Sequence, residues 1–387
     1  MIKFGKAVVK FRIPILILSF LLLIPAGISY INTRINYDIL SYLPGDIDTM
    51  KGQDILLEDF GTGAFSLCVV EDMSEKQVVD LENEIKGVEH VKDVIWYDTL
   101  ADISIPMDVL PSEIKDAFNN EDKNATLMIV TFDTSMSADE TLDAIEQLRT
   151  LTKQQCFMSG MSAVVTDIKK ICNSEAIAYV ILAAGLSAVV LALTMDSFLV
   201  PVFFLLSIGM AIIYNLGTNF VSGEISFITQ ALAAVLQLAV TMDYSIFLWH
   251  SYQENQERFP GDKKRAMAHA ISNTVSSVVA SSVTTVAGFV AMCFMTFTLG
   301  LDLGIVMAKG VVLGVLCCVT VLPAMILTFD GALEKTRHRA LIPKFDKMGT
   351  FATRKFPIFL VLFVVILIPA VYGCLLYTSP SPRDSTS

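Results

Sequence analysis

The sequence predicts an α-helical multi-pass membrane bundle that carries an extracytoplasmic α+β domain, and three observations support this fold class. The chain of 387 residues is 53% hydrophobic and has a mean hydropathy of +0.60. It contains several apolar runs of roughly 18 or more residues, each long enough to cross the core of a bilayer. Between the first two runs lies a polar segment of about 140 residues, long enough for a folded domain.

The first apolar run is predicted to be a permanent membrane anchor. It follows Lys3, Lys6, Lys10 and Arg12, but it is too long for a removable signal peptide and is poor in small-residue cleavage sites. The predicted spans are residues 12–30, 176–195, 198–218, 227–249, 274–297, 303–328 and 357–376.

Basic residues near the span ends indicate the orientation. They gather at the N-terminus, from Lys263 to Arg265, and between Lys335 and Lys355, and such residues favour the cytoplasmic side. We therefore expect a multi-pass protein of the cell membrane, with a cytoplasmic N-terminus and with residues 32–173 on the extracytoplasmic side.

Residues 32–173 are strongly acidic. They contain 27 Asp and Glu against 11 Lys and Arg, a net charge of −16, whereas the whole chain carries −11. An acidic balance without a clustered basic face argues against binding of nucleic acid. The solubility of an exposed domain accounts for it.

The same segment is predicted to fold as strand, helix, strand, twice in succession. This order fits a ferredoxin-like sheet with both helices on one face, and Ser74 is placed to cap the first helix. An insertion is expected between the two halves at residues 107–120. The elements are a strand at 64–72, a helix at 74–87, strands at 91–100 and 124–134, a helix at 137–153 and a short strand at 154–160.

The seven cysteines show no metal-ligand spacing, and we expect neither a metal nor a cofactor. Cys68 and Cys156 lie outside the apolar runs, in the predicted first and fourth strands, which are neighbours in this fold. Whether they form a disulfide is left open.

The first segment of the sequence is repeated near its C-terminal end. Residues 3–28 (KFGKAVVKFRIPILILSFLLLIPAGI) and 347–373 (KMGTFATRKFPIFLVLFVVILIPAVYG) share a lysine two residues before a glycine, basic residues before a proline, and a later Ile-Pro-Ala. The helix at 357–376 is therefore predicted to start a second copy of the first half.

Several motifs occur in a characteristic order after the first span. They are YLPGD (42–46), Asp243-Tyr244 before SYQEN (251–255), SSVTTVAGFVAM (281–292) and AKGVVLGVLCCVTVLPAM (308–325). With one span, a large outer domain and five further spans, the chain resembles the N-terminal half of a resistance-nodulation-division (RND) exporter of the MmpL-like branch. The resemblance covers residues 1–374.

The resemblance implies ferredoxin-like porter subdomains and proton-driven export of lipids or other hydrophobic or amphiphilic compounds. The partners would be that substrate, protons, and either the missing C-terminal half or a partner half-transporter, with a homo-oligomer as a further option. In the family a matching helix of the second half completes the proton relay.

Six segments are expected on this basis. They are a cytoplasmic N-terminus with the first helix (1–31), an extracytoplasmic porter-like domain (32–173), a five-helix bundle (174–330), a basic cytoplasmic linker (331–356), a seventh helix (357–376) and a non-native tail (377–387).

Asp243 is the residue that the sequence singles out. It lies in the apolar stretch AVTMDYSIFLWH (239–250), and a charged side chain at the centre of a membrane helix costs about 2.5–3.5 kcal/mol. Such a residue is kept where it faces protein or a wet cavity, so we predict that Asp243 relays protons with Tyr244 as its companion. Gln230, Gln237 and Tyr244 are spaced by seven and share a face, which either lines the path or contacts adjacent helices.

Hydroxyl residues of the fifth span have two interpretations. Ser281 and Thr284 either permit close helix packing, with their hydroxyls bonded to their own helix, or give water access to Asp243.

The sixth span contributes one basic residue, Lys309. It either pairs with Asp243, extends outward, or pairs with Asp302, and an expected depth difference of about 10 Å argues against contact with Asp243. Gly310 and Gly314 are predicted to mark a close contact between helices.

Two other functions stay open. The five spans after the outer domain have the layout of a sterol-sensing domain, which binds lipid without transport, and a sensor needs no titrating carboxyl such as Asp243. A protein-translocation accessory of the same superfamily shares the topology. An enzyme is not expected, because the four histidines are scattered and no nucleophile elbow or phosphate loop is present.

Overall fold

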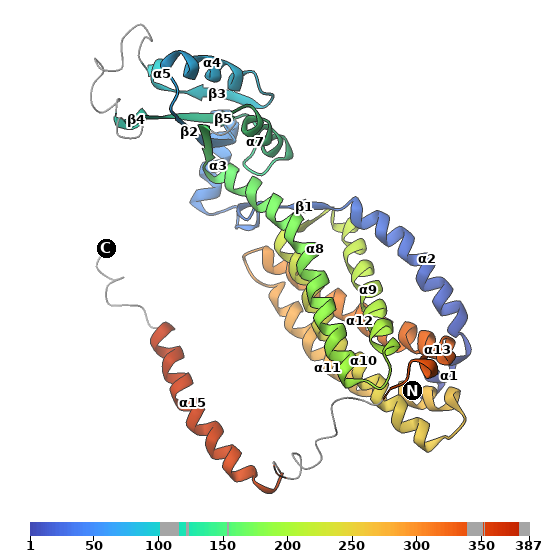
Figure 1. The fold of residues 1–387 in the computed structure, drawn as a ribbon. Coiled ribbons are helices and arrows are strands. Elements are labelled where there is room, and N and C mark those ends of the chain that lie inside the picture. Colours follow the sequence, from blue (N-terminus) through green and yellow to red (C-terminus); the bar gives the residue numbers. More distant parts are fainter. Residues whose placement is uncertain (101–115, 121–123, 153–154, 339–350, 352, 379–387) are drawn as a thin grey trace. The chain divides into compact units, whose positions relative to one another are not determined.

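The computed structural model describes residues 1–100, 116–120, 124–152, 155–338, 351 and 353–378. It divides into two compact units, Met1–His338 and Arg339–Ser387. The larger unit contains a helical bundle and a small domain with a mixed arrangement of helices and strands (Figure 1).

Seven helices among the described residues are long and apolar enough to cross a membrane, so the chain is a multi-pass membrane protein. This confirms the number of spans expected from the sequence. The helices are α2 (Arg12–Ile31), α8 (Met161–Thr194), α9 (Leu199–Gly217), α10 (Phe227–Arg258), α11 (Lys263–Met292), α12 (Leu299–Thr328) and, in the second unit, α15 (Phe356–Thr378).

Helix α12 is the centre of the bundle. It packs against α2, α9, α10 and α11, and most of its side chains are buried. Small residues make this possible, because they let neighbouring backbones approach closely. By contrast, α2 and α8 present mostly exposed apolar side chains, as expected of helices that face lipid.

The helix of the second span is longer than expected. It begins at Met161 instead of near residue 176, and its 34 residues extend for about 51 Å, more than the hydrocarbon core of roughly 30 Å. Its first turns belong to the small α+β domain, where Arg149 donates to both carboxylate oxygens of Asp167, at 2.6 and 2.9 Å. The chain thus enters the membrane without a break in the helix.

The small α+β domain has the predicted ferredoxin-like topology. Strands β2 (Ala64–Glu71), β3 (Val91–Ile95), β5 (Ala125–Phe132) and β6 (Cys156–Ser159) pair antiparallel in the order β3-β5-β2-β6. Helices α4 (Glu75–Lys86) and α7 (Asp139–Thr152) pack on the buried face of this sheet. Its core consists of apolar side chains of the strands and both helices, including Val70, Ile85, Val130, Ile145 and Leu148.

The predicted cap of one helix is confirmed, whereas the structure differs from the predicted element bounds at two other places. Ser74 and Gln77 form a capping box at the start of α4. The predicted strand at 91–100 ends at Ile95, and Tyr97–Leu100 form the short helix α5. The reason is local, because the Thr99 hydroxyl accepts from the Trp96 N–H and starts a helical turn.

The second change concerns the start of α7 and the insertion. The helix begins at Asp139, and the Ser137 hydroxyl donates to Asp38 at 2.9 Å. Of the insertion expected at 107–120, residues 107–115 lie outside the described residues, and Asn119–Asn120 form the short strand β4 beside β5.

Further elements are not anticipated from the sequence. Strands β1 (Arg34–Asn36) and β7 (Glu224–Ser226) pair in parallel and join the end of α2 to the start of α10. Further helices among the described residues include α1 (Ile2–Lys10), α3 (Asp48–Glu58) and α13 (Asp330–Lys335), and short 3-10 helices include η1 (Leu40–Tyr42) and η5 (Thr218–Ser222).

Cys68 and Cys156 are neighbours in the sheet. Strands β2 and β6 are adjacent, as predicted, and both thiols are free and buried. A hydrogen bond with Cys156 and burial together raise the pKa of Cys68, so that thiol resists ionisation.

Candidate functional site

Helix α10 carries the polar residues that the sequence singles out. Its start is fixed by Ser226, whose side chain accepts from the Ile228 N–H at 3.3 Å, and by Asp302, which accepts from the Ser226 N–H at 3.0 Å. The first turn is thereby attached to α12, so the rotation of α10 about its axis is set from its end.

Asp243 and Tyr244, adjacent on α10, differ in burial. Tyr244 is buried in the bundle, with 5% of its surface exposed, whereas Asp243 is exposed on the outside of the larger unit. No hydrogen bond or ion pair of Asp243 is recorded within the described residues. A carboxylate in an apolar span is therefore left without a protein partner on an uncovered face of the bundle.

A groove of about 420 Å³ lies between α10 and α11. Asp243 precedes by one helical turn Phe247, which forms part of the groove wall. The other lining residues are mostly polar: Tyr244, Ser251, Asn273, Thr274, Ser277, Val278 and Ser281.

The buried face of α10 contacts α9 and α12 through polar side chains. Gln237 is 1% exposed and accepts from Asn215 Nδ2 at 3.0 Å, while its own Nε2 has no partner within the described residues. A Cβ at Gly310 would lie 2.5 Å from Asn215 Nδ2. This amide pair therefore requires glycine on α12, and the predicted helix contact at Gly310 is confirmed.

Gly314 makes the second half of that contact. A Cβ there would lie 2.1 Å from Thr241 Cγ2, so α12 and α10 lie closer than any side chain at 314 permits. The Thr241 hydroxyl in turn donates to the Gln237 carbonyl at 2.6 Å.

The remaining predicted residues lie apart from Asp243. Gln230 donates to the Tyr30 hydroxyl at 2.9 Å, which links α10 to α2. Lys309 donates to Asn219 Oδ1, so its recorded partner is neither Asp243 nor Asp302.

The hydroxyls of α11 differ in their contacts. Ser281 lines the groove between α10 and α11. Thr284 donates to the Ser281 carbonyl at 2.7 Å, which is the back-bonding expected for it. Ser282 and Thr285 also bond to carbonyls of their own helix.

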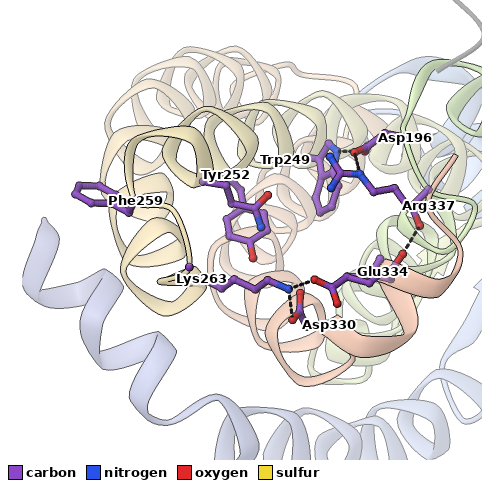
Figure 2. A pocket seen from close by; sticks show the side chains of 12 residues that line it. Asp196, Trp249, Tyr252, Phe259, Lys263, Asp330, Glu334 and Arg337 are labelled. Carbon is purple, nitrogen blue, oxygen red and sulfur yellow. Dashed lines mark hydrogen bonds and ion pairs between the residues drawn. The ribbon is translucent and has the colours of Figure 1, made fainter. Parts of the chain in front are cut away.

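A second cavity, of about 160 Å³, lies at the other end of α10 and is not anticipated from the sequence (Figure 2). Lys263 donates to Asp330 at 2.6 Å and also to Glu334, and this contact lowers the pKa of Glu334. Asp196 accepts from Trp249 Nε1 at 3.2 Å and pairs with Arg337 at 3.4 Å.

The ion pairs join the start of α11 to α13, and the segment before α9 to the segment after α13, while the Trp249 hydrogen bond adds α10 (Figure 2). Their members are spread from residue 196 to 337, and no local sequence signal identifies them as one cluster. Each charged side chain on the cavity wall lies beside one of opposite charge. These polar contacts close this end of the bundle. Within the described ranges no group of His, Cys, Asp and Glu is placed to hold a metal ion.

Comparison with known proteins yields one family and several relatives. The sequence model of the MMPL family matches residues 67–355. The membrane protein MJ1562 of Methanocaldococcus jannaschii is 24% identical over 355 residues, which cover 81% of this chain and 90% of that protein. "Probable transport protein MmpL12" of Mycobacterium tuberculosis is 26% identical over 296 residues, 72% of this chain and 25% of that protein.

The chain thus spans nearly all of the archaeal relative but about a quarter of the mycobacterial one. Among solved structures, SecDF in its super-membrane-facing form aligns with 13% identity and a TM-score of 0.44, covering 84% of this chain and 39% of that one.

Proposed function

Because this chain belongs to the MMPL family of membrane proteins, we propose that it acts in proton-driven export of lipids or other hydrophobic or amphiphilic compounds across the cell membrane. In this proposal the chain forms one half of the transporting unit. A C-terminal half, a partner half-transporter or a second copy supplies the other.

The position of Asp243 carries the proposal. An ionised aspartate at the centre of a membrane helix costs about 2.5–3.5 kcal/mol in lipid, and such residues are kept where protein or water covers them. Asp243 is exposed on the larger unit, one helical turn before Phe247 in the wall of the groove between α10 and α11. The uncovered face of α10 and α11 is therefore the face against which the other half docks.

A carboxyl on an exposed helix face near a groove with Ser277 and Ser281 on its wall can exchange protons with water as the contact between the halves changes. Protonation removes the cost of a charge in an apolar contact, and deprotonation restores it. One proton that moves down a potential of 100 mV releases about 2.3 kcal/mol, enough to shift a conformational equilibrium about 50-fold. Tyr244, which lines the groove, is the proposed companion of Asp243.

The substrate class has separate support in an apolar cavity between α2, α9 and α12. It has a volume of about 660 Å³, in the range of sites for small organic ligands. Leu22, Pro25, Leu316 and Val321 are among its walls, and Tyr214 closes one side by donating to the Ser19 carbonyl. A hydrophobic tail fits such a surface.

The proposed orientation places the N-terminus in the cytoplasm. Lys6, Lys10, Lys264 and Arg265 line a single cavity, so the first two basic clusters of the sequence lie at the same end of the bundle. The positive-inside rule assigns that end to the cytoplasm. The acidic outer domain then faces the other side.

The test is Asp243→Asn in the complete transporter, reconstituted into vesicles with an imposed proton gradient. We expect gradient-driven export to be abolished while expression and membrane insertion are unchanged. Thr284→Val is the matched control, because within the described residues the Thr284 hydroxyl bonds to the Ser281 carbonyl of its own helix, and export should persist. Unchanged export in Asp243→Asn would remove the relay role, and lipid binding without any export in the wild type would favour the sensor.

A further inference from the structure

Helix α1 crosses the start of α11 at the end of the bundle where the N-terminus lies (Figure 1). The crossing is close, because a Cβ at Gly5 would lie 2.3 Å from the Ala268 carbonyl oxygen. Val8 and Val9 are buried in the same contact. The packing brings the basic residues of two segments, far apart in the sequence, into one place.

These residues line a cavity of about 700 Å³. It has five cationic side chains and one carboxylate, that of Asp262. This carboxylate is already engaged, because it accepts from the Arg265 N–H at 2.9 Å and caps α11. The cationic residues are Lys6, Lys10, Arg12, Lys264 and Arg265, and His269 lies beside them.

The five cations have no acidic partner among the residues that the structure describes. No ion pair to any of them is recorded within the described residues. The Arg12 Nε is buried and has no hydrogen-bond acceptor there, and Arg265 lies over the Phe259 ring, 4.4 Å from its centroid. A cavity wall with five positive charges, unpaired within the described part of the chain, favours binding of a multivalent anion. N–H donors on several sides of the cavity can then bond to different oxygens of the same anion.

The surroundings of the cavity are apolar on the side of the membrane. Arg12 is the first residue of the span α2, so the cavity lies where the bundle enters the bilayer. Phe4 and Phe11 are exposed on and beside α1, and Ile13 is exposed on α2. An amphipathic helix with exposed aromatic residues and lysines is typical of a membrane interface.

We propose that this cavity binds the headgroup phosphate of an anionic phospholipid, whose acyl chains lie along the exposed apolar side chains of α1 and α2. A bound lipid would fix α1 against α11 by neutralising charges that otherwise repel one another. The site is separate from Asp243 and from the apolar cavity between α2, α9 and α12, and it does not require transport.

The experiment measures the affinity of the purified full chain, in phosphatidylcholine nanodiscs, for a fluorescent phosphatidylglycerol. Each cation near an anionic surface contributes about 1 kcal/mol, so Lys6→Gln and Lys264→Gln should each weaken binding about fivefold. The double variant should lose about 25-fold. Lys3→Gln is the matched control, because it removes the same charge from α1 outside the cavity.

Two comparisons make the outcome decisive. Lys6→Arg keeps the charge and should retain wild-type affinity, and thermal unfolding of every variant shows that the fold is intact. The proposal is overturned if Lys3→Gln weakens binding as much as Lys6→Gln, which indicates a diffuse surface effect. It is also overturned if inorganic phosphate competes as strongly as the lipid, which indicates a site for a free anion.

Discussion

Gly314→Ala tests whether α10 and α12 must lie in direct contact. The new Cβ would lie 2.1 Å from Thr241 Cγ2, whereas carbon atoms in favourable contact are about 3.5–4.0 Å apart. The helices must then separate by roughly 1.5 Å, or Thr241 must rotate and lose its 2.6 Å bond to the Gln237 carbonyl. Such overpacking costs about 1–3 kcal/mol.

The assay is unfolding of the purified protein from mild detergent by titration with a denaturing detergent. Gly288→Ala is the matched control, because nothing lies within 4 Å of a Cβ at that position of α11. Replacing an unconstrained helical glycine by alanine should stabilise the protein by about 0.5–1 kcal/mol. The two substitutions add the same methyl group and should therefore have opposite effects.

A second substitution identifies the clash. Thr241→Ser removes Cγ2 and keeps the hydroxyl, so Thr241→Ser combined with Gly314→Ala should recover most of the lost stability. The coupling between the two changes should be about 1 kcal/mol or more. Equal stability of Gly314→Ala and Gly288→Ala, or no recovery in the double variant, would refute the close contact.

Two further predictions concern groups outside the membrane. Cys68 and Cys156 are buried free thiols, so an alkylating reagent should modify neither of them in the folded protein. After unfolding without reductant, the reagent should modify both. If both stay protected until a reductant is added, they form a disulfide. Burial, aided by the nearby Asp302 carboxylate, raises the pKa of Tyr42 to about 12. The folded state then holds this proton more tightly than the unfolded chain, so the Tyr42 contribution to stability is present below pH 10.0 and is lost as the pH rises to about 12. Tyr42→Phe should remove that part of the alkaline loss in thermal unfolding, and an identical pH profile would contradict the assignment.

The sequence predicts the fold well where local patterns determine structure. Apolar runs set the seven spans, and the alternation of strands and helices is enough for the ferredoxin-like order. Ser74 caps α4 because capping depends on residues three apart. The contact at Gly310 and Gly314 follows from small residues spaced by one helical turn.

Other features depend on tertiary contacts that no local pattern contains. The parallel pair of β1 and β7 joins Arg34 to Glu224, and the ion pairs of Figure 2 join Asp196 to Arg337. The same limit holds for the candidate site. Periodicity places Tyr244 and Gln237 on one flank of α10, but only the packed bundle leaves Asp243 exposed.

The most direct measurement follows the protonation of Asp243 itself. Difference infrared spectra of the complete transporter in vesicles, recorded as the proton gradient is imposed and released, contain a carboxyl band that Asp243→Asn should remove. We predict that this band appears and disappears with the gradient. A band that stays constant while export proceeds would contradict the proposal that Asp243 exchanges protons during transport.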